Sequence, residues 1–270
     1  MKVLLTGAAG RIGTTLRDAL PELGWPVRCF DREPIEDPAV DSVVGDLASA
    51  ADLDAALAGV DAVVHLAGMP TEAPWPAIRD ANIDGLVNVF EAARRAGVRR
   101  IVWASSNHAV GFTPAGYAGG DELPADLAPR PDTLYGVSKA FGEALGRYYV
   151  ERYGMQVACL RIGTFIDRPR DLRTLSTWLS PADCARLVAA CLGAPDLTYA
   201  IVWGVSANTR RTWSLAAGCA LGYEPRDDAE RYAADLEAPA PDPSDGFVGG
   251  GFTSPGFGID EVLARSDRLA

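Results

Sequence analysis

The stretch Lys2-Val-Leu-Leu-Thr6-Gly7-Ala-Ala-Gly10-Arg-Ile-Gly13 decides the fold of this 270-residue chain. Residues 2–6 are typical of a short buried strand, and the glycines that follow have the spacing G-x-x-G-x-x-G. Gly7 permits a tight turn, Gly10 lets the backbone approach a pyrophosphate, and Gly13 lets a helix pack closely on the strand. The stretch therefore predicts a strand, a glycine turn and a helix whose first amides face a dinucleotide.

The next apolar segment, residues 27–30, predicts a second strand that ends at Asp31, eighteen residues beyond Gly13. A carboxylate at this position can accept hydrogen bonds from both hydroxyls of an adenosine ribose. It also repels a 2′-phosphate, so we predict NAD rather than NADP as the cofactor. Arg32 beside it is interpreted as a solvated turn residue.

Strand-like and helix-like stretches alternate through the rest of the chain, which is typical of a parallel sheet flanked by helices. We expect an α/β fold with a Rossmann-type doubly wound sheet, helices on both faces and a small C-terminal substrate-binding region. A single domain is expected, with residues 1–160 mainly binding the dinucleotide and residues 161–237 mainly on the substrate side. Residues 238–270 form a Pro- and Gly-rich tail that we expect to be ordered only against another surface. Helices are expected near residues 52–58, 78–96, 135–152, 181–192 and from about 213, and strands near 61–68, 100–104, 156–162 and 200–204.

The composition favours a small molecule as the partner of this chain. The hydrophobic content of 48% is enough for a sizeable core. The net charge of −11 argues against nucleic acid and anionic membranes. No apolar run approaches about 18 residues and the first strand leaves no room for a signal peptide, so we expect a cytoplasmic protein. The five cysteines lack C-x-x-C spacing and are expected to be buried and reduced, with no metal site: Cys29, Cys159, Cys184, Cys191 and Cys219.

The segment Tyr135-Gly-Val-Ser-Lys139 contains one of only two lysines among 25 basic residues. If the segment lies at the start of a helix, positions i and i+4 share a face, so the ammonium can lie beside the phenol. It would then lower the pKa of Tyr135 from about 10 toward neutrality, as a general base requires. The alternative interpretation is a solvated lysine near a core tyrosine. A second polar group, Ser105-Ser106-Asn107-His108, follows a predicted strand at the edge where open α/β sheets bind ligands.

The glycine turn, Asp31, Ser106 and the Tyr135/Lys139 pair together resemble the extended short-chain dehydrogenase/reductase family, over most of the chain. Five motifs, at residues 105–108, 135–139, 161–164, 173–178 and 202–204, resemble members that oxidise the anomeric carbon of a hexuronate. This resemblance implies oxidation of D-glucuronate or D-galacturonate to an aldarolactone, with NAD as the hydride acceptor.

The resemblance also implies a role for each site residue. Tyr135 would remove the C1 hydroxyl proton, Ser106 would stabilise the developing oxyanion, and Lys139 would hold the nicotinamide ribose. The substrate would be bound by Ser106, Asn107, His108, Tyr135, Thr164 and Arg173, with Arg173 clamping the carboxylate. The cofactor would contact Gly7, Gly10, Arg11, Ile12, Gly13, Asp31, Asp46, Leu47, Leu66, Ala67, Gly68, Asn82, Tyr135, Lys139 and Ile162.

Several alternatives stay open at this point. His108 could instead be bonded to local backbone. The chain could be a sugar-nucleotide epimerase or dehydratase, although its C-terminal region is short for a nucleotide site, or a non-catalytic dinucleotide sensor. Pro70 stands where the resemblance leads us to expect a serine, and the loop at residues 111–131 is longer than expected. A homo-oligomer is expected.

Overall fold

The computed structural model describes residues 1–117, 119, 122–236 and 246–266. These residues form a seven-stranded sheet with the order β3-β2-β1-β4-β5-β6-β9, and every neighbouring pair is parallel. The strand order reverses between β1 and β4, which is the position where doubly wound sheets open a crevice. The predicted α/β fold is therefore confirmed. The strands are β1 (Val3–Thr6), β2 (Val27–Asp31), β3 (Ser42–Val44), β4 (Ala62–His65), β5 (Arg100–Ser106), β6 (Gln156–Ile162) and β9 (Tyr199–Gly204), with a separate pair of β7 (Thr164–Phe165) and β8 (Trp178–Leu179).

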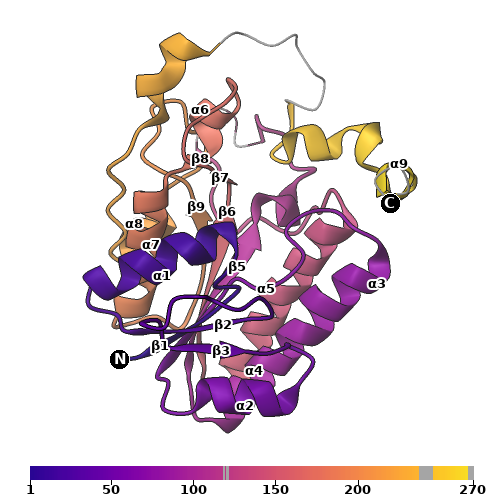
Figure 1. The fold of residues 1–270 in the computed structure, drawn as a ribbon. Helices are drawn as coiled ribbons and strands as arrows, with labels where there is room; N and C mark the ends of the chain where they lie inside the picture. The colour runs from indigo at the N-terminus through magenta and orange to yellow at the C-terminus, as the bar shows by residue number, and fades with distance from the viewer. Residues whose placement is uncertain (118, 120–121, 237–245, 267–270) are drawn as a thin grey trace.

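Helices cover both faces of this sheet (Figure 1). Along β1, Val3 and Leu5 enter one apolar cluster and Leu4 enters the other, because successive side chains point to opposite faces. The cluster with Val3 contains α1 and α7, and the cluster with Leu4 contains α2, α4 and α5. The α-helices are α1 (Arg11–Glu22), α2 (Ala50–Leu57), α3 (Trp75–Ile78), α4 (Gly85–Arg95), α5 (Leu134–Tyr153), α6 (Thr174–Thr177), α7 (Pro181–Gly193), α8 (Ala216–Ala220) and α9 (Ile259–Ser266), with a π-helical turn η1 (Arg79–Asp84) and 3-10 turns η2 (Asn107–Val110), η3 (Ala229–Asp235), η5 (Gly250–Thr253) and η6 (Pro255–Phe257).

The turn between β1 and α1 has no room for side chains. Gly7 has a φ of +71°, and a Cβ there would lie 2.7 Å from the backbone nitrogen of Ala67 at the end of β4. A Cβ on Gly13 would collide with the carbonyl oxygen of Gly7. The glycines therefore let the first turn of α1 approach both β1 and the neighbouring strand end.

Two helices differ from the prediction. The segment expected as one helix near residues 78–96 is interrupted by η1, where Asn82 turns inward to bond the backbone of Met69. Such π-turns often occur at functional sites. The helix expected from about residue 213 is only the five-residue α8.

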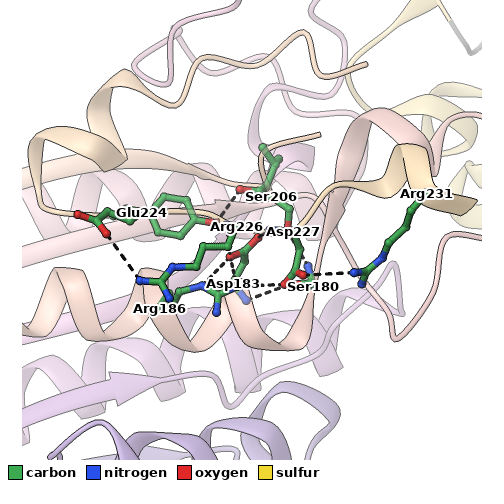
Figure 2. A network of polar contacts seen from close by, with 10 residues as sticks. Ser180, Asp183, Arg186, Ser206, Glu224, Arg226, Asp227 and Arg231 are labelled. Atoms are coloured by element: carbon green, nitrogen blue, oxygen red, sulfur yellow. Dashed lines mark hydrogen bonds and ion pairs between the residues drawn. The ribbon is translucent and has the colours of Figure 1, made fainter. Parts of the chain in front are cut away.

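The chain beyond α8 is held by polar contacts at the N-terminus of α7 (Figure 2). The buried Asp183 carboxylate accepts the backbone N–H groups of Arg226 and Asp227, at 2.9 and 3.0 Å. Ser180 caps α7 and donates a 2.6 Å hydrogen bond to Asp227. This segment needs no long helix, because α7 provides partners for its backbone.

The C-terminal segment, residues 246–258, folds back over the carboxyl edge of the sheet (Figure 1). Val248 and Gly249 donate hydrogen bonds to the carbonyls of Thr113 and Gly111, both at 2.9 Å, and Phe247 pairs with Pro114. Part of the predicted tail is therefore ordered against the chain's own site, while residues 237–245 and 267–270 lie outside the described residues.

Other predictions can be checked in the described ranges. Four cysteines are buried, but Cys219 is exposed, so its predicted burial is wrong. Cys219 lies in the five-residue α8, in which Gly218 is the buried residue. In the described part of the chain no cluster of three metal-ligating residues occurs, and no helix there is long and apolar enough to cross a membrane. The extra residues expected at 116–120 lie only partly within the described ranges.

Candidate active site

The carboxyl end of β5 delivers the first polar group of the site. The strand runs to Ser106, which caps the 3-10 turn η2 by accepting the backbone N–H of His108 at 3.3 Å. Asn107 is buried and donates a 3.1 Å hydrogen bond to the carbonyl of Val248, 141 residues along the chain. The tight turn therefore presents Ser106 and His108 to the site and fixes Asn107 beneath the C-terminal segment.

The first turn of α5 delivers the second group. Thr133 caps this helix by accepting the Gly136 N–H at 3.0 Å, and Glu72 accepts the Tyr135 N–H at 2.7 Å. Tyr135 and Lys139 are both 7% exposed. The Lys139 ammonium lies 5.3 Å from the centroid of the Tyr135 ring, as the predicted i,i+4 spacing requires. Ser106 from β5 lies near enough to the Tyr135 phenol to lower its pKa, so the two predicted catalytic groups lie together.

The charge state of this pair differs from the prediction. Burial raises the pKa of Tyr135 to about 12, although the hydrogen bond with Ser106 opposes the rise. Burial also lowers the pKa of Lys139 to about 8. The predicted fall of the Tyr135 pKa toward neutrality is therefore wrong, because burial of the phenol outweighs the effect of the neighbouring ammonium, which donates to the Ala104 carbonyl at 2.8 Å.

The glycine turn fits a dinucleotide. Helix α1 begins after Gly10 with no side-chain cap and no acidic residue in its first turn. A Cβ on Gly10 would meet only the Gly7 carbonyl, at 3.2 Å, so the outer side of the turn is open. The backbone N–H groups at Arg11, Ile12 and Gly13 thus begin a twelve-residue helix whose positive end suits a pyrophosphate.

Asp31 lies beside this turn, as its predicted role requires. Its carboxylate accepts the Ala9 N–H at 2.9 Å and the Glu33 N–H at 3.2 Å. These bonds orient the carboxylate at the end of β2, next to the glycine turn.

The remaining residues predicted to bind the cofactor lie around the same crevice. Asn82 bonds the N–H and carbonyl of Met69 and the hydroxyl of Ser138, which braces the turn at Gly68. The Leu47 carbonyl accepts the Asn88 side-chain amide at 2.9 Å. Leu66 and Ala67 follow β4, Asp46 follows β3, and Ile162 ends β6. Their contacts with a cofactor stay predictions.

The substrate side contains the two other predicted residues. Arg173 precedes α6 and donates a 2.6 Å hydrogen bond to the carbonyl of Val248, the same oxygen that Asn107 contacts. A Cβ on Gly250 would collide with the Arg173 guanidinium, so the C-terminal segment lies directly on it. Thr164 shares a 2.8 Å hydrogen bond with Thr177. The predicted carboxylate clamp is thus joined to the segment that covers the site.

Four site residues were not predicted. Asp132 bonds His108, Glu72 bonds Tyr135, Phe252 stacks on His108 at 4.0 Å, and Glu143 pairs with Arg161 beneath the site. The adjoining Asp-Thr at residues 132–133 was a usable signal, because such residues cap helices. No local sequence pattern predicted the role of Phe252, because it stacks on His108 only when the distant C-terminal segment folds back over the site.

Known proteins carry the same fold and motifs. A model of the NAD dependent epimerase/dehydratase family matches residues 3–192. A uronate dehydrogenase from Agrobacterium fabrum is 42% identical over 251 residues, which cover 92% of this chain and 93% of the relative. An NAD-dependent glucose-6-phosphate dehydrogenase from Haloferax volcanii is 40% identical and covers 87% of this chain and 97% of its own. A solved uronate dehydrogenase variant from Agrobacterium tumefaciens, complexed with NAD, has a TM-score of 0.86 at 40% identity and covers 93% of this chain and 96% of that chain.

The chain therefore belongs to the NAD dependent epimerase/dehydratase family. Within that family it is similar to uronate dehydrogenases along nearly its whole length, as the sequence motifs predicted.

Proposed function

We propose that the protein oxidises the C1 hydroxyl of hexuronates, D-glucuronate and D-galacturonate, to aldarolactones with NAD. The observation that carries this proposal is that Ser106 and Tyr135 lie together at the carboxyl end of β5, with the Lys139 ammonium 5.3 Å from the centroid of the Tyr135 ring. A serine hydroxyl that donates a hydrogen bond and a phenol that accepts a proton can both act on one substrate oxygen. This arrangement suits the removal of a proton from a carbinol. The similarity to uronate dehydrogenases supports the substrate class.

The proposed reaction removes a hydride from C1 and a proton from its hydroxyl. When bound, NAD would accept the C1 hydrogen as a hydride, while the C1 oxygen keeps its bond to carbon and becomes the lactone carbonyl. Tyr135 takes the hydroxyl proton, and Ser106 donates a hydrogen bond to the same oxygen as negative charge develops on it. Because burial keeps the pKa of Tyr135 at about 12, nearby positive charge is needed to favour the tyrosinate. Lys139 is the adjacent cation and would also hold the nicotinamide ribose.

Substrate recognition would involve side chains on the side of the site that the C-terminal segment covers. We propose that Arg173 clamps the carboxylate, because a planar guanidinium matches a carboxylate in two parallel hydrogen bonds. Asn107 and His108 would contact sugar hydroxyls, with Thr164 on the same wall. We thus propose that residues 161–237 lie mainly on the substrate side, as the sequence predicts. Val248 of the C-terminal segment would lie on the same side.

On the cofactor side we propose NAD held by the glycine turn, with Asp31 on the adenosine ribose. Asp46 and Leu47 would contact the adenine, while Leu66, Ala67 and Gly68 would line the dinucleotide. We also propose a cytoplasmic homo-oligomer, which size-exclusion chromatography with light scattering tests directly.

The first test follows NADH formation with NAD and each of glucuronate, galacturonate, glucose, glucose 6-phosphate and UDP-glucose. The proposal expects turnover with the two uronates alone. Activity confined to glucose 6-phosphate would contradict the substrate class, and activity confined to the nucleotide sugar would move the protein to the epimerase and dehydratase reactions.

A matched variant separates catalysis from binding. Tyr135→Phe keeps the ring but removes the hydroxyl, so turnover should fall by roughly three orders of magnitude or more while NAD binding persists. A protein that binds NAD yet lacks turnover even as wild type would instead be a dinucleotide sensor.

A further inference from the structure

The buried contact between His108 and Asp132 has consequences beyond packing. Nδ1 of His108 lies 2.7 Å from a carboxylate oxygen of Asp132, whose side chain is fully buried. Phe252 stacks on the imidazole at 4.0 Å and Tyr135 meets it edge-on at 5.8 Å. The stacked ring restricts the plane of the imidazole, and the carboxylate restricts its rotation in that plane.

The carboxylate of Asp132 lies in a space that fits it closely. A Cβ on Gly111 or on Gly249 would collide with it, and these two residues are joined by a 2.9 Å backbone hydrogen bond. Its other oxygen accepts the Thr133 hydroxyl at 3.0 Å. The C-terminal segment, through Gly249, therefore closes over the same carboxylate that bonds His108.

We propose that Asp132 is a positioning residue that sets the tautomer of His108 and thereby makes it an acceptor for a substrate hydroxyl. A carboxylate only accepts hydrogen bonds, so Nδ1 of His108 must carry the proton. In the neutral imidazole, Nε2 then has a lone pair and accepts. This deepens the proposed function, on which its substrate part rests: a lone pair repels a carboxylate, so the sugar hydroxyls face His108 and the carboxylate lies elsewhere.

The neighbouring Thr133 makes the proposal testable. Its hydroxyl accepts the Gly136 N–H as the cap of α5, and it has one proton, which goes to Oδ1 of Asp132. In Asp132→Asn the atom at this position must still be an acceptor, so the amide oxygen stays beside Thr133. The amide NH₂ is then directed at Nδ1 of His108, which must become the acceptor. The substitution should therefore move the imidazole proton to Nε2, as in serine proteases, where an asparagine in place of the triad aspartate imposes the wrong tautomer.

The decisive measurement is a long-range ¹H–¹⁵N spectrum of the ¹⁵N-labelled full chain at about pH 8.5, above the usual titration range of histidine. Only two histidines contribute, and a His108→Gln spectrum identifies the remaining signals as those of His65. We expect Nδ1–H for His108 in the wild type and Nε2–H in Asp132→Asn. Asp126→Asn removes one charge from the exposed part of the same loop and should leave the wild-type pattern.

Kinetics then test the link to the substrate. In Asp132→Asn the KM for glucuronate should rise roughly 10- to 100-fold, with kcat changed less and the KM for NAD unchanged, because a lost ground-state hydrogen bond is felt as binding. Asp126→Asn should match the wild type. A wild-type Nε2–H tautomer, or an unchanged tautomer in folded Asp132→Asn, overturns the proposal; if Asp132→Asn does not fold, the wild-type tautomer alone decides. If uronates are not substrates, the proposed function fails while the tautomer result still stands.

Discussion

The buried ion pair between Glu143 of α5 and Arg161 of β6 should dominate the stability of the layer beneath the site. The two side chains are 4% and 1% exposed, and the guanidinium bonds both carboxylate oxygens, at 2.8 and 2.7 Å. Arg161 also donates to the carbonyls of Ala125 and Leu127, and Ser105 donates to Glu143 at 2.7 Å. The hydrogen-bond partners of the guanidinium therefore lie on two other segments of the chain, α5 and the loop that contains Ala125 and Leu127.

Arg161→Met keeps an unbranched stem but removes the guanidinium, which leaves a buried carboxylate with Ser105 as its remaining hydrogen-bond partner. Breaking a buried pair costs about 3–5 kcal/mol. The carbonyls of Ala125 and Leu127 also lose their donor, so we expect the loss of unfolding free energy to lie in the upper part of that range. For a chain of this size, we expect the midpoint of thermal unfolding to fall by roughly 10 °C or more.

The double variant Glu143→Leu/Arg161→Met tests the cause. It removes both charges, so the two carbonyls and the Ser105 hydroxyl lose partners but no buried charge is left, and its loss should be about 2–4 kcal/mol, smaller than that of Arg161→Met alone. The exposed pair Arg147 and Glu151 is the control, because Arg147→Met should change stability by less than about 0.5 kcal/mol. Urea unfolding measures all four proteins. An Arg161→Met variant within about 1 kcal/mol of the wild type, or a double variant that loses as much stability as Arg161→Met or more, would refute this reasoning.

Three further expectations concern the site. Asp31→Ser should raise the kcat/KM ratio of NADP to NAD at least about tenfold, since the carboxylate that repels a 2′-phosphate is gone while Arg32 remains; an unchanged ratio contradicts its role. Arg173→Ala should raise the KM for glucuronate roughly 100-fold, with Arg173→Lys intermediate and the KM for NAD unchanged; equal losses on neutral aldoses count against the clamp. Because burial lowers the pKa of Lys139 to about 8, the unfolded chain binds more protons from about pH 8 to 10.5. The stability of the wild type relative to Lys139→Met should therefore rise with pH in that window, by up to about 3 kcal/mol, and parallel curves in urea unfolding would exclude the shift.

The sheet and the positions of Ser106 and Tyr135 were predictable because local patterns determine them. A buried strand followed by spaced glycines leaves one backbone path, since a Cβ at Gly7 or Gly13 would strike backbone atoms. We could predict that Ser106 and Tyr135 lie near each other, because Ser106 ends a strand at the carboxyl edge of the sheet, where such folds bind ligands, and Tyr135 lies in the first turn of the next α-helix. The charge state could not be predicted, since the desolvation that raises the pKa of Tyr135 depends on how deeply the packed chain buries the phenol.

The C-terminal segment could not be placed from the sequence for a different reason. Its Pro, Asp and Gly composition lacks the apolar periodicity that predicts helices and strands. Its order arises from hydrogen bonds to Gly111 and Thr113, and from glycines that leave room for other side chains. Contacts between distant segments produce no local sequence pattern. The sequence therefore predicted only a tail and not its position over the site.

The position of that segment links substrate recognition to the end of the chain. The carbonyl of Val248 accepts hydrogen bonds from both Asn107 and Arg173, and Phe252 stacks on His108. Three side chains proposed to contact the sugar are thus held by one segment, whereas Tyr135 and Lys139 are held by α5 and the end of β5. Changes at Val248 should therefore alter substrate affinity through Asn107 and Arg173 while leaving Tyr135 and Lys139 in place, whereas Phe252 also packs on the apolar cluster that contains Tyr135.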